Sequence, residues 1–216
     1  VELFSGVGGG MLGHHFMLGH KPVCAVEEAF FQRSVLAKRI ADGVLPPMEI
    51  HEDVVDFDGT PWRGTDILSG GFPCTGLSSG GRKDWLKNEA SALIWHQLRI
   101  CEEMQPTYLF VENSHNMRTK ALHEIVPELQ KMGYREMTWC VIRASDLGAP
   151  HFRARMWLLA KRGGKKGRLP KMDPQNVPAC GYVNGKTLRA ITHKDLGLVH
   201  IERKYHLPTL TTKDRD

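Results

Sequence analysis

The 216-residue sequence predicts an α/β fold built on a doubly wound, mostly parallel sheet. Short apolar strand candidates alternate with helical runs over residues 1–160, which is the pattern of parallel strands joined by crossover helices. The run Thr107–Val111 is apolar throughout, as is typical of a central parallel strand. A glycine-rich turn after the first strand indicates a nucleotide-binding unit of this fold class.

The first half of the chain is expected to supply three strands and two helices. They are a strand at Val1–Phe4, a glycine turn at residues 5–10, a helix at Met11–Leu18, a strand at Pro22–Glu27, a helix at Phe30–Ile40 and a short strand within Glu49–Phe57. The helices are predicted from the spacing of their apolar residues, and the strands from short apolar runs.

The second half continues the alternation. We expect a strand at Asp66–Leu68, a long amphipathic helix capped by Asn88, a strand at Thr107–Val111, a helix at Lys120–Met132, and strands at Arg135–Ala144 and Met156–Ala160. The loop after Leu68 contains several glycines, which suits a lid that closes over a substrate.

Basic residues are concentrated at the end of the chain. Residues 161–216 contain 13 Lys and Arg against 5 Asp and Glu, a net charge of +8, whereas residues 1–160 have a net charge of −3. Helical periodicity is also lost there. We therefore expect a domain at 1–160 and a basic, irregular or β-rich region at 161–216 that meets a polyanion. A solvated tail is the alternative that charge leaves open.

Composition excludes several other classes. The 41% hydrophobic content supports a packed core rather than disorder. No apolar run is long enough to span a membrane, so no membrane partner is expected. The five cysteines lie more than four positions apart, so no zinc-type pairing and no metal site is expected.

Two reactive side chains follow strand candidates. Cys74 lies in the loop after Asp66–Leu68, and Glu112 comes directly after Thr107–Val111. The carboxyl ends of parallel strands meet at one edge of the sheet, where ligands bind, so both side chains should lie there. Cys74 alone is better explained as a buried structural cysteine. Glu112 at the same edge favours a functional site instead, because burying a carboxylate after a strand costs free energy unless it is paired or belongs to a site.

Two acidic residues could contact a nucleotide. Glu27 lies about 20 positions after the glycine turn, where an acidic side chain can accept hydrogen bonds from ribose hydroxyls. It could instead stabilise the start of the following helix. Asp53 could accept a hydrogen bond from an adenine amine, or it could form a turn.

Over residues 1–160 the chain resembles the C5-cytosine DNA methyltransferase family, with six motifs in the family order. Phe4-Ser5-Gly6-Val7-Gly8-Gly9 resembles motif I, Glu27 motif II, Asp53 motif III, Gly71-Phe72-Pro73-Cys74 motif IV, Glu112-Asn113 motif VI, and His151-x-Arg153-x-Arg155 motif VIII. The chain departs from the family at three positions. Glu28 stands where an aromatic or large apolar residue is usual, Ser114 where Val is usual, and His151 where Gln is usual. Motif X, a helix that closes the cofactor pocket in the family, is not visible.

The resemblance implies a Rossmann-like methyltransferase that acts on carbon 5 of cytosine in duplex DNA. Cys74 would attack carbon 6 of a flipped-out base, while Glu112 would hydrogen-bond or protonate ring N3. Arg155 would reach the cytosine O2, and Arg153 would support it or a phosphate. Asn113 would hold the loop backbone in place.

The same resemblance implies S-adenosyl-L-methionine as the methyl donor. The residues expected to hold it are Phe4, Ser5, Gly6, Gly8, Gly9, Glu27, Asp53, Val54, Gly71 and Pro73. The loop Thr75–Lys87 and the basic region 161–216 would grip the DNA backbone. We expect a monomer that acts in the cytoplasm of a prokaryotic or phage-infected cell, or wherever the host DNA resides, as in restriction-modification.

Three alternatives stay open. A tRNA cytosine-5 methyltransferase would share the core motifs, because a fold does not fix the substrate. A non-catalytic regulatory subunit would keep the fold, although all the catalytic residue types are present. A nicotinamide-dependent oxidoreductase is suggested only by the glycine turn, and it leaves Cys74, Glu112 and Arg155 without a role.

Overall fold

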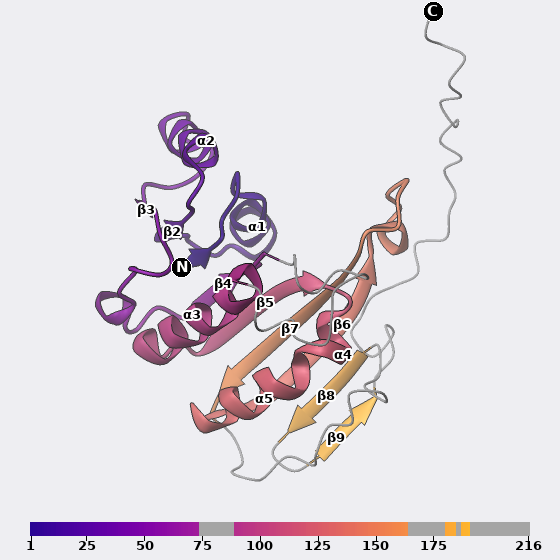
Figure 1. The fold of residues 1–216 in the computed structure, drawn as a ribbon. Coiled ribbons are helices and arrows are strands. Elements are labelled where there is room, and N and C mark those ends of the chain that lie inside the picture. The colour runs from indigo at the N-terminus through magenta and orange to yellow at the C-terminus, as the bar shows by residue number, and fades with distance from the viewer. Residues whose placement is uncertain (74–88, 164–179, 185–186, 191–216) are drawn as a thin grey trace, which may run out of the picture.

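A computed structural model describes residues 1–73, 89–163, 180–184 and 187–190 of the chain. In this part of the chain nine strands form one sheet in the order β3-β2-β1-β4-β5-β7-β6-β8-β9 (Figure 1). The predicted α/β fold is confirmed. The strand order reverses direction between β1 and β4, which is where ligands bind in doubly wound sheets.

The sheet has a parallel half and an antiparallel half. The parallel strands are β1 (Glu2–Leu3), β2 (Cys24–Val26), β3 (Glu49–His51), β4 (Ile67–Gly70) and β5 (Tyr108–Ser114). The antiparallel strands are β6 (Tyr134–Arg143), β7 (Ala154–Arg162), β8 (Cys180–Asn184) and β9 (Thr187–Ala190). The prediction of a mostly parallel sheet therefore applies to β1–β5, and the later strands make the sheet mixed.

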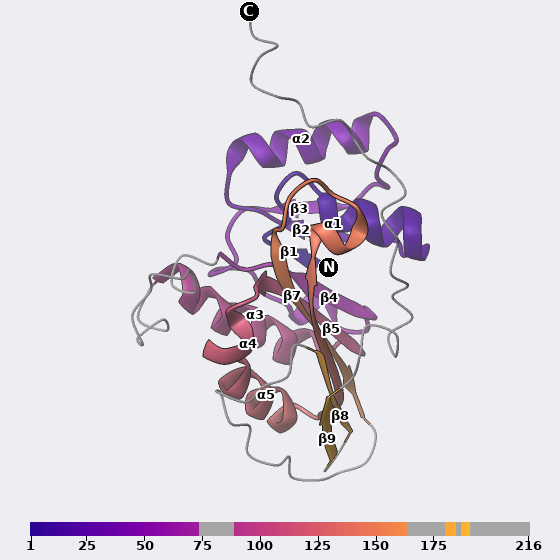
Figure 2. The ribbon, with the colours of Figure 1, turned by 90° about the vertical axis from the view of Figure 1, so that its right-hand side faces the viewer.

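Helices cover both faces of the sheet. They are α1 (Gly9–Leu12), the π-helix η1 (Gly13–Met17), α2 (Phe30–Ala41), the 3-10 helix η2 (Thr60–Trp62), α3 (Glu89–Met104), α4 (Met117–Lys120), α5 (Leu122–Lys131) and the 3-10 helix η4 (Ala144–Leu147). Figure 2 shows the later strands nearly edge-on, with α1 on one side and α3, α4 and α5 on the other. This follows from right-handed crossovers that run in opposite directions from the centre.

Strand β5 differs from its prediction in length and burial. It continues through Glu112 and Asn113 to Ser114, because β7 pairs with it as far as Ser114 opposite Arg155. Its residues alternate between buried and half-buried rather than being buried on both faces. The buried set, Leu109, Val111 and Asn113, belongs to one face, and Glu112 lies on the other.

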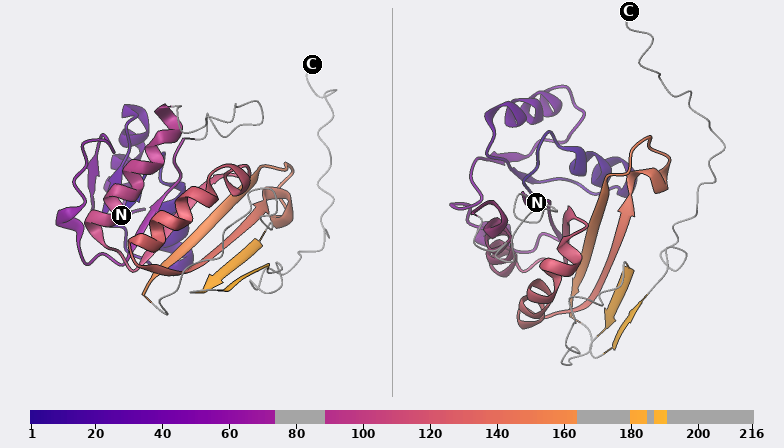
Figure 3. Two further views of the ribbon diagram at one scale, coloured as in Figure 1. Left: turned by 60° about the horizontal axis from the view of Figure 1, so that its bottom comes forward. Right: turned by 45° about the vertical axis from the view of Figure 1, so that its right-hand side comes forward.

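Strands β8 and β9 continue the sheet beyond β6, on the side away from β1 (Figure 3). Strand β7 itself runs to Arg162, so the sheet crosses the expected boundary near residue 161. The division into two domains stays a prediction. Among the described residues, no helix has both the length and the apolar character needed to cross a bilayer.

The side chain of Tyr134 joins β6 to the segment that precedes β5. It is almost fully buried, its hydroxyl donates a hydrogen bond to Pro106 O at 2.8 Å, and it accepts one from Cys101 Sγ at 3.1 Å. Replacing Tyr134 by Phe leaves the Pro106 carbonyl unpaired. We expect the free energy of unfolding to fall by about 1–3 kcal/mol.

Chemical denaturation of the purified protein measures this change. Tyr108→Phe, at the half-buried start of β5, is the control and should alter stability much less. Equal effects of the two substitutions would contradict the importance of the Tyr134 hydrogen bonds.

Candidate active site

An ion pair between Glu112 and Arg155 lies at the carboxyl edge of the sheet. Arg155 Nε and Glu112 Oε1 are 2.9 Å apart, and each side chain is a little more than one quarter exposed. Ser114 on β5 is opposite Arg155 on β7, so Glu112, two residues earlier, is the diagonal neighbour of Arg155 on the same face. The antiparallel register thus brings together two residues that are 43 positions apart.

Burial and two nearby cations act in opposite senses on the pKa of the Glu112 carboxyl. Burial raises the pKa of the Glu112 carboxyl, because a charged group loses hydration inside the protein. The cations of Arg155 and Arg153 act in the opposite sense but do not cancel this rise. Glu112 therefore holds its proton to a higher pH than free glutamic acid.

Gly71, the first residue after β4, lies directly beside the Glu112 carboxylate. A Cβ atom at this position would be 2.6 Å from Glu112 Oε2, closer than real Cβ contacts. Gly71 was predicted to bind the cofactor, and the structure shows that its lack of a side chain also makes room for Glu112. The loop after β4 therefore leaves the space that the Glu112 side chain of β5 occupies.

Asn113 ties the same loop to β5. It is 2% exposed, and its Nδ2 donates a hydrogen bond to Phe72 O at 2.8 Å. Phe72 is itself buried, and Pro73 is exposed. Cys74, the predicted nucleophile, lies outside the described residues. The hydrogen bond fixes the backbone two residues before it.

Glu27 joins β2 to the glycine turn. Its carboxylate accepts hydrogen bonds from Gly6 N at 2.7 Å and from Ala29 N at 3.0 Å, and so it contacts both the turn and the start of α2. Ser5 is buried, and its backbone N donates to Val26 O at 3.1 Å. These bonds hold the turn against the carboxyl ends of β1 and β2.

The glycine turn has room for a nucleoside ligand. Gly6 has a φ of 53°, and a Cβ atom at Gly6 or Gly9 would meet nothing within 4 Å, so open space adjoins the backbone there. Gly8, with a φ of 84°, instead faces Leu36. The Glu27 carboxylate uses one lone pair on each oxygen and can accept two further hydrogen bonds. These features fit the ribose of S-adenosylmethionine. Phe4, also predicted here, has a φ of 53° at the start of the turn.

Asp53 lies in the turn after β3. Its Oδ1 accepts a hydrogen bond from Val55 N at 2.8 Å, so the turn-forming contact is present, and the adenine contact stays a prediction. Arg99 of α3 was not predicted to belong to this site. Its Nη2 donates a hydrogen bond to Val54 O at 2.9 Å, and its Nη1 donates one to Phe57 O at 2.9 Å. The signal available in the sequence was its i,i+4 spacing to Glu103, whose Oε1 lies 2.7 Å from Arg99 Nη1.

Glu2 is a second residue that the sequence analysis missed. It is 9% exposed, it contacts Ser69 Oγ at 3.4 Å, and burial raises the pKa of its carboxyl to about 7. A Cβ atom at Gly10 would be 2.6 Å from Glu2 Oε1. Glu2 thus links β1, β4 and the start of α1. It borders a cavity of about 650 Å³ at the edge opposite to Glu112. The signal available in the sequence for Glu2 was a carboxylate within a short apolar strand.

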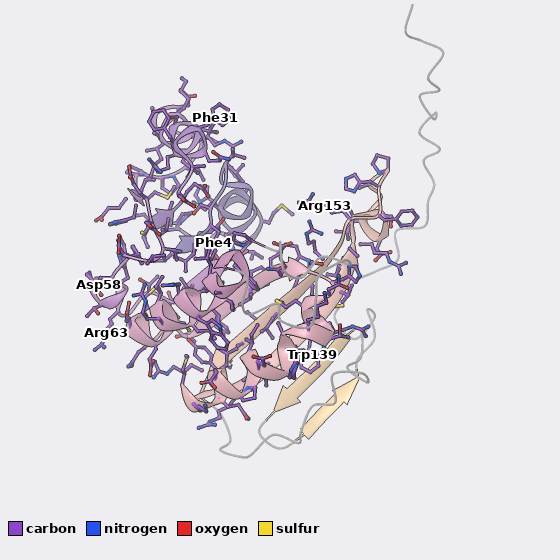
Figure 4. All side chains as sticks on the ribbon, viewed as in Figure 1. Phe4, Phe31, Asp58, Arg63, Trp139 and Arg153 are labelled. Atoms are coloured by element: carbon purple, nitrogen blue, oxygen red, sulfur yellow. The ribbon has the colours of Figure 1, made fainter. Side chains whose placement is uncertain are left out.

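Arg153 lies just before β7, at the end of the hairpin that joins β6 to β7 (Figure 4). It is exposed and has a φ of 27°, which is uncommon for a non-glycine residue. Its charge lowers the pKa of Glu112, so it is near the ion pair. His151, two residues earlier, is exposed.

The model of the family described as C-5 cytosine-specific DNA methylase matches residues 1–215. The Type II methyltransferase M.CviJI of Paramecium bursaria Chlorella virus IL3A is 32% identical over 164 residues, which cover 75% of this chain and 42% of that protein. M1.ScrFI of Lactococcus lactis subsp. cremoris is 29% identical over 163 residues, covering 74% and 40%. The chain thus spans about two fifths of these relatives.

Solved structures show a similar fold. A protein encoded within an E. coli prophage and assigned as a DNA modification methyltransferase is 25% identical, with a TM-score of 0.56 over 74% of this chain and 45% of that one. The S. pombe Dnmt2 methyltransferase is 16% identical, with a TM-score of 0.58 over 77% and 51%, and shows the likeness of fold.

The contact between Gly71 and Glu112 is tested by Gly71→Ala. The added methyl group must displace the carboxylate at the end of the Glu112 side chain, which Arg155 holds, and we expect a loss of roughly 0.5–1 kcal/mol in the free energy of unfolding. Gly13→Ala is the matched control, because a Cβ atom there meets nothing within 4 Å. A Gly71→Ala protein as stable as the control would contradict the contact.

The pKa of Glu112 is tested by Arg155→Gln. Removing the cation takes away a group that lowers this pKa, so the pKa should rise further above that of free glutamic acid. Carbon-13 NMR of the carboxyl across a pH series measures it. Arg135→Gln, at the opposite end of β6, should leave it unchanged. A fall of the Glu112 pKa in Arg155→Gln would contradict the assigned ion pair.

Proposed function

Because the chain belongs to the C-5 cytosine-specific DNA methylase family, we propose that it forms the catalytic part of an enzyme that transfers a methyl group from S-adenosylmethionine to carbon 5 of cytosine in duplex DNA. The observation that carries the proposal is the Glu112–Arg155 ion pair, placed beside the loop that leads to Cys74. This arrangement offers an acid and a cation to one small ring.

Cys74 is the proposed nucleophile. Its thiolate adds to carbon 6 of the cytosine ring, which breaks the aromaticity of the ring and makes carbon 5 nucleophilic. A thiol with an ordinary pKa is only a few per cent ionised at pH 7, so nearby cations must favour the thiolate. Arg153 and Arg155 are cations at the same edge of the sheet.

Glu112 and Arg155 act on the polar edge of the base. A carboxyl with a raised pKa can hold a proton toward ring N3, which draws electron density away from carbon 6 and makes it more susceptible to the thiolate. Arg155 then donates to the ring O2, and Arg153 supports Arg155 or a phosphate. Loss of the carbon-5 proton and release of Cys74 complete the reaction.

The glycine turn and Glu27 are proposed to hold the methyl donor. Glu27 would accept hydrogen bonds from both ribose hydroxyls while it keeps its own contacts to Gly6 and Ala29. Asp53 would bind the adenine amine from a turn that Arg99 fixes. When bound, the cofactor supplies an electrophilic methyl group to the activated carbon 5.

Contact with the duplex is proposed for two segments that lie outside the described residues. The loop Thr75–Lys87 would close over the extruded base, and the rest of the basic region would bind phosphates and read the sequence. We propose that residues 1–160 are the catalytic domain and that the enzyme acts as a monomer where its host DNA resides.

Trapping with 5-fluorocytosine tests the proposal. A fluorine at carbon 5 blocks the loss that releases the enzyme, so the Cys74 adduct should persist through denaturing electrophoresis. DNA copied from a whole genome with 5-fluoro-dCTP presents every sequence context, so no recognition site needs to be known. The full-length protein should form the adduct only with cofactor present, and Cys74→Ala should form none.

Methyl incorporation from labelled cofactor into genomic DNA and into tRNA separates the alternatives. A Cys74→Ala protein that still transfers methyl groups would show that the nucleophile is wrong. Methyl incorporation into tRNA but not into genomic DNA would favour the tRNA methyltransferase and overturn the proposed substrate.

A further inference from the structure

The tip of the β6–β7 hairpin is a closed, well-connected turn. Ala144 N donates to Phe152 O at 2.9 Å, and Ala149 N donates to Ala144 O at 3.0 Å. The Asp146 carboxylate accepts a hydrogen bond from Arg143 N at 2.9 Å, and Gly148 has a φ of 89° that closes the 3-10 turn η4. The hairpin end is therefore a built structure that presents its side chains in fixed positions.

This turn exposes two large apolar side chains. Phe152 is 74% exposed and Leu147 is 58% exposed. An exposed side chain of this size gives up the favourable burial that a partner surface would offer. Scattered apolar residues on a surface are common, but these two belong to one tightly connected turn next to the candidate site.

The charges around the two apolar residues are suited to a polyanion. Arg143, His151 and Arg153 are all exposed at the tip. Asp146, the acid of the turn, accepts a hydrogen bond from the Arg143 backbone. An apolar centre with arginines beside it fits a nucleic-acid strand, in which sugars and base faces alternate with phosphates.

The position of the tip points to the strand that carries the target base. Phe152 precedes Arg155 by three residues, so their Cα atoms lie at most about 11 Å apart. Figure 1 shows the hairpin reaching past the end of β5, on the edge where Glu112 and Arg155 meet. A base that enters this site from a duplex must bring its neighbouring nucleotides across the same rim.

We propose that the β6–β7 hairpin tip is a DNA-contact surface, in which Phe152 and Leu147 pack against the sugar and base next to the extruded cytosine and Arg143 binds a flanking phosphate. The proposal rests on the proposed function, because it needs a base that leaves the duplex. It assigns the hairpin a role separate from that of the loop Thr75–Lys87 and the basic region.

Two substitutions in the full-length protein distinguish the apolar contact from the ionic one. Phe152→Ala should raise the dissociation constant for fluorescent fragments of unmethylated genomic DNA by roughly tenfold at every salt concentration. Arg143→Gln should instead reduce the slope of log affinity against log salt by about one, because one phosphate contact is lost. Phe152→Tyr keeps the ring and should bind like the wild type.

Phe16→Ala is the matched control. Phe16 is 65% exposed on η1, in the chain segment that leads away from the carboxyl edge, and its loss should not change DNA affinity. Affinity for the cofactor, measured by calorimetry, should be the same in all four variants and shows that each is folded.

The outcomes separate this proposal from the proposed function. If the wild type methylates DNA but Phe152→Ala binds DNA as tightly as Phe16→Ala does, the hairpin surface is wrong and the activity stands. If DNA affinity depends on Phe152 but no methyl group reaches DNA, the proposed function is wrong, and the hairpin binds DNA without the proposed place beside an extruded cytosine.

Discussion

The ion pair between Glu112 and Arg155 is the contact on which the candidate site depends. It forms because β7 runs antiparallel between β5 and β6 and places Arg155 diagonally across from Glu112. A half-buried ion pair costs hydration that its own attraction only partly returns, and the raised pKa of Glu112 reflects that cost. The pair also depends on Gly71, the residue that follows β4, because a Cβ atom there would come within 2.6 Å of the Glu112 carboxylate.

The two halves of the sheet supply different parts of the site. The parallel half holds the glycine turn and Glu27, and the antiparallel half contributes Arg155 of β7. They meet at the loop after β4, whose backbone is held by Asn113. Strand β4 lies between β1 and β5, so the backbone that enters this loop runs between the glycine turn and Arg155.

Much of this architecture could be predicted from the sequence, because strand and helix periodicities and the glycine turn are local patterns. The helices at Phe30 and after residue 88, and the strands before Glu27 and Glu112, were placed within a few residues. The mixed character of the sheet was missed, because strand direction is set by pairing between distant segments. The half-buried face of β5 was not predicted either, because the burial of a strand also depends on segments that are distant in the sequence. Arg99 and Glu2 escaped notice because their roles consist of contacts to backbone or to distant strands, which leave no motif in the sequence.

The most direct test of the account is bisulfite sequencing of genomic DNA from a host that lacks cytosine methylation and expresses the full-length protein. The account predicts 5-methylcytosine within one short recurring sequence for the wild type, and none for Glu112→Gln, whose amide cannot protonate ring N3. A folded, cofactor-binding protein that leaves genomic cytosine unmodified, or a Glu112→Gln protein that methylates it as well as the wild type does, would contradict the central role of the Glu112–Arg155 site.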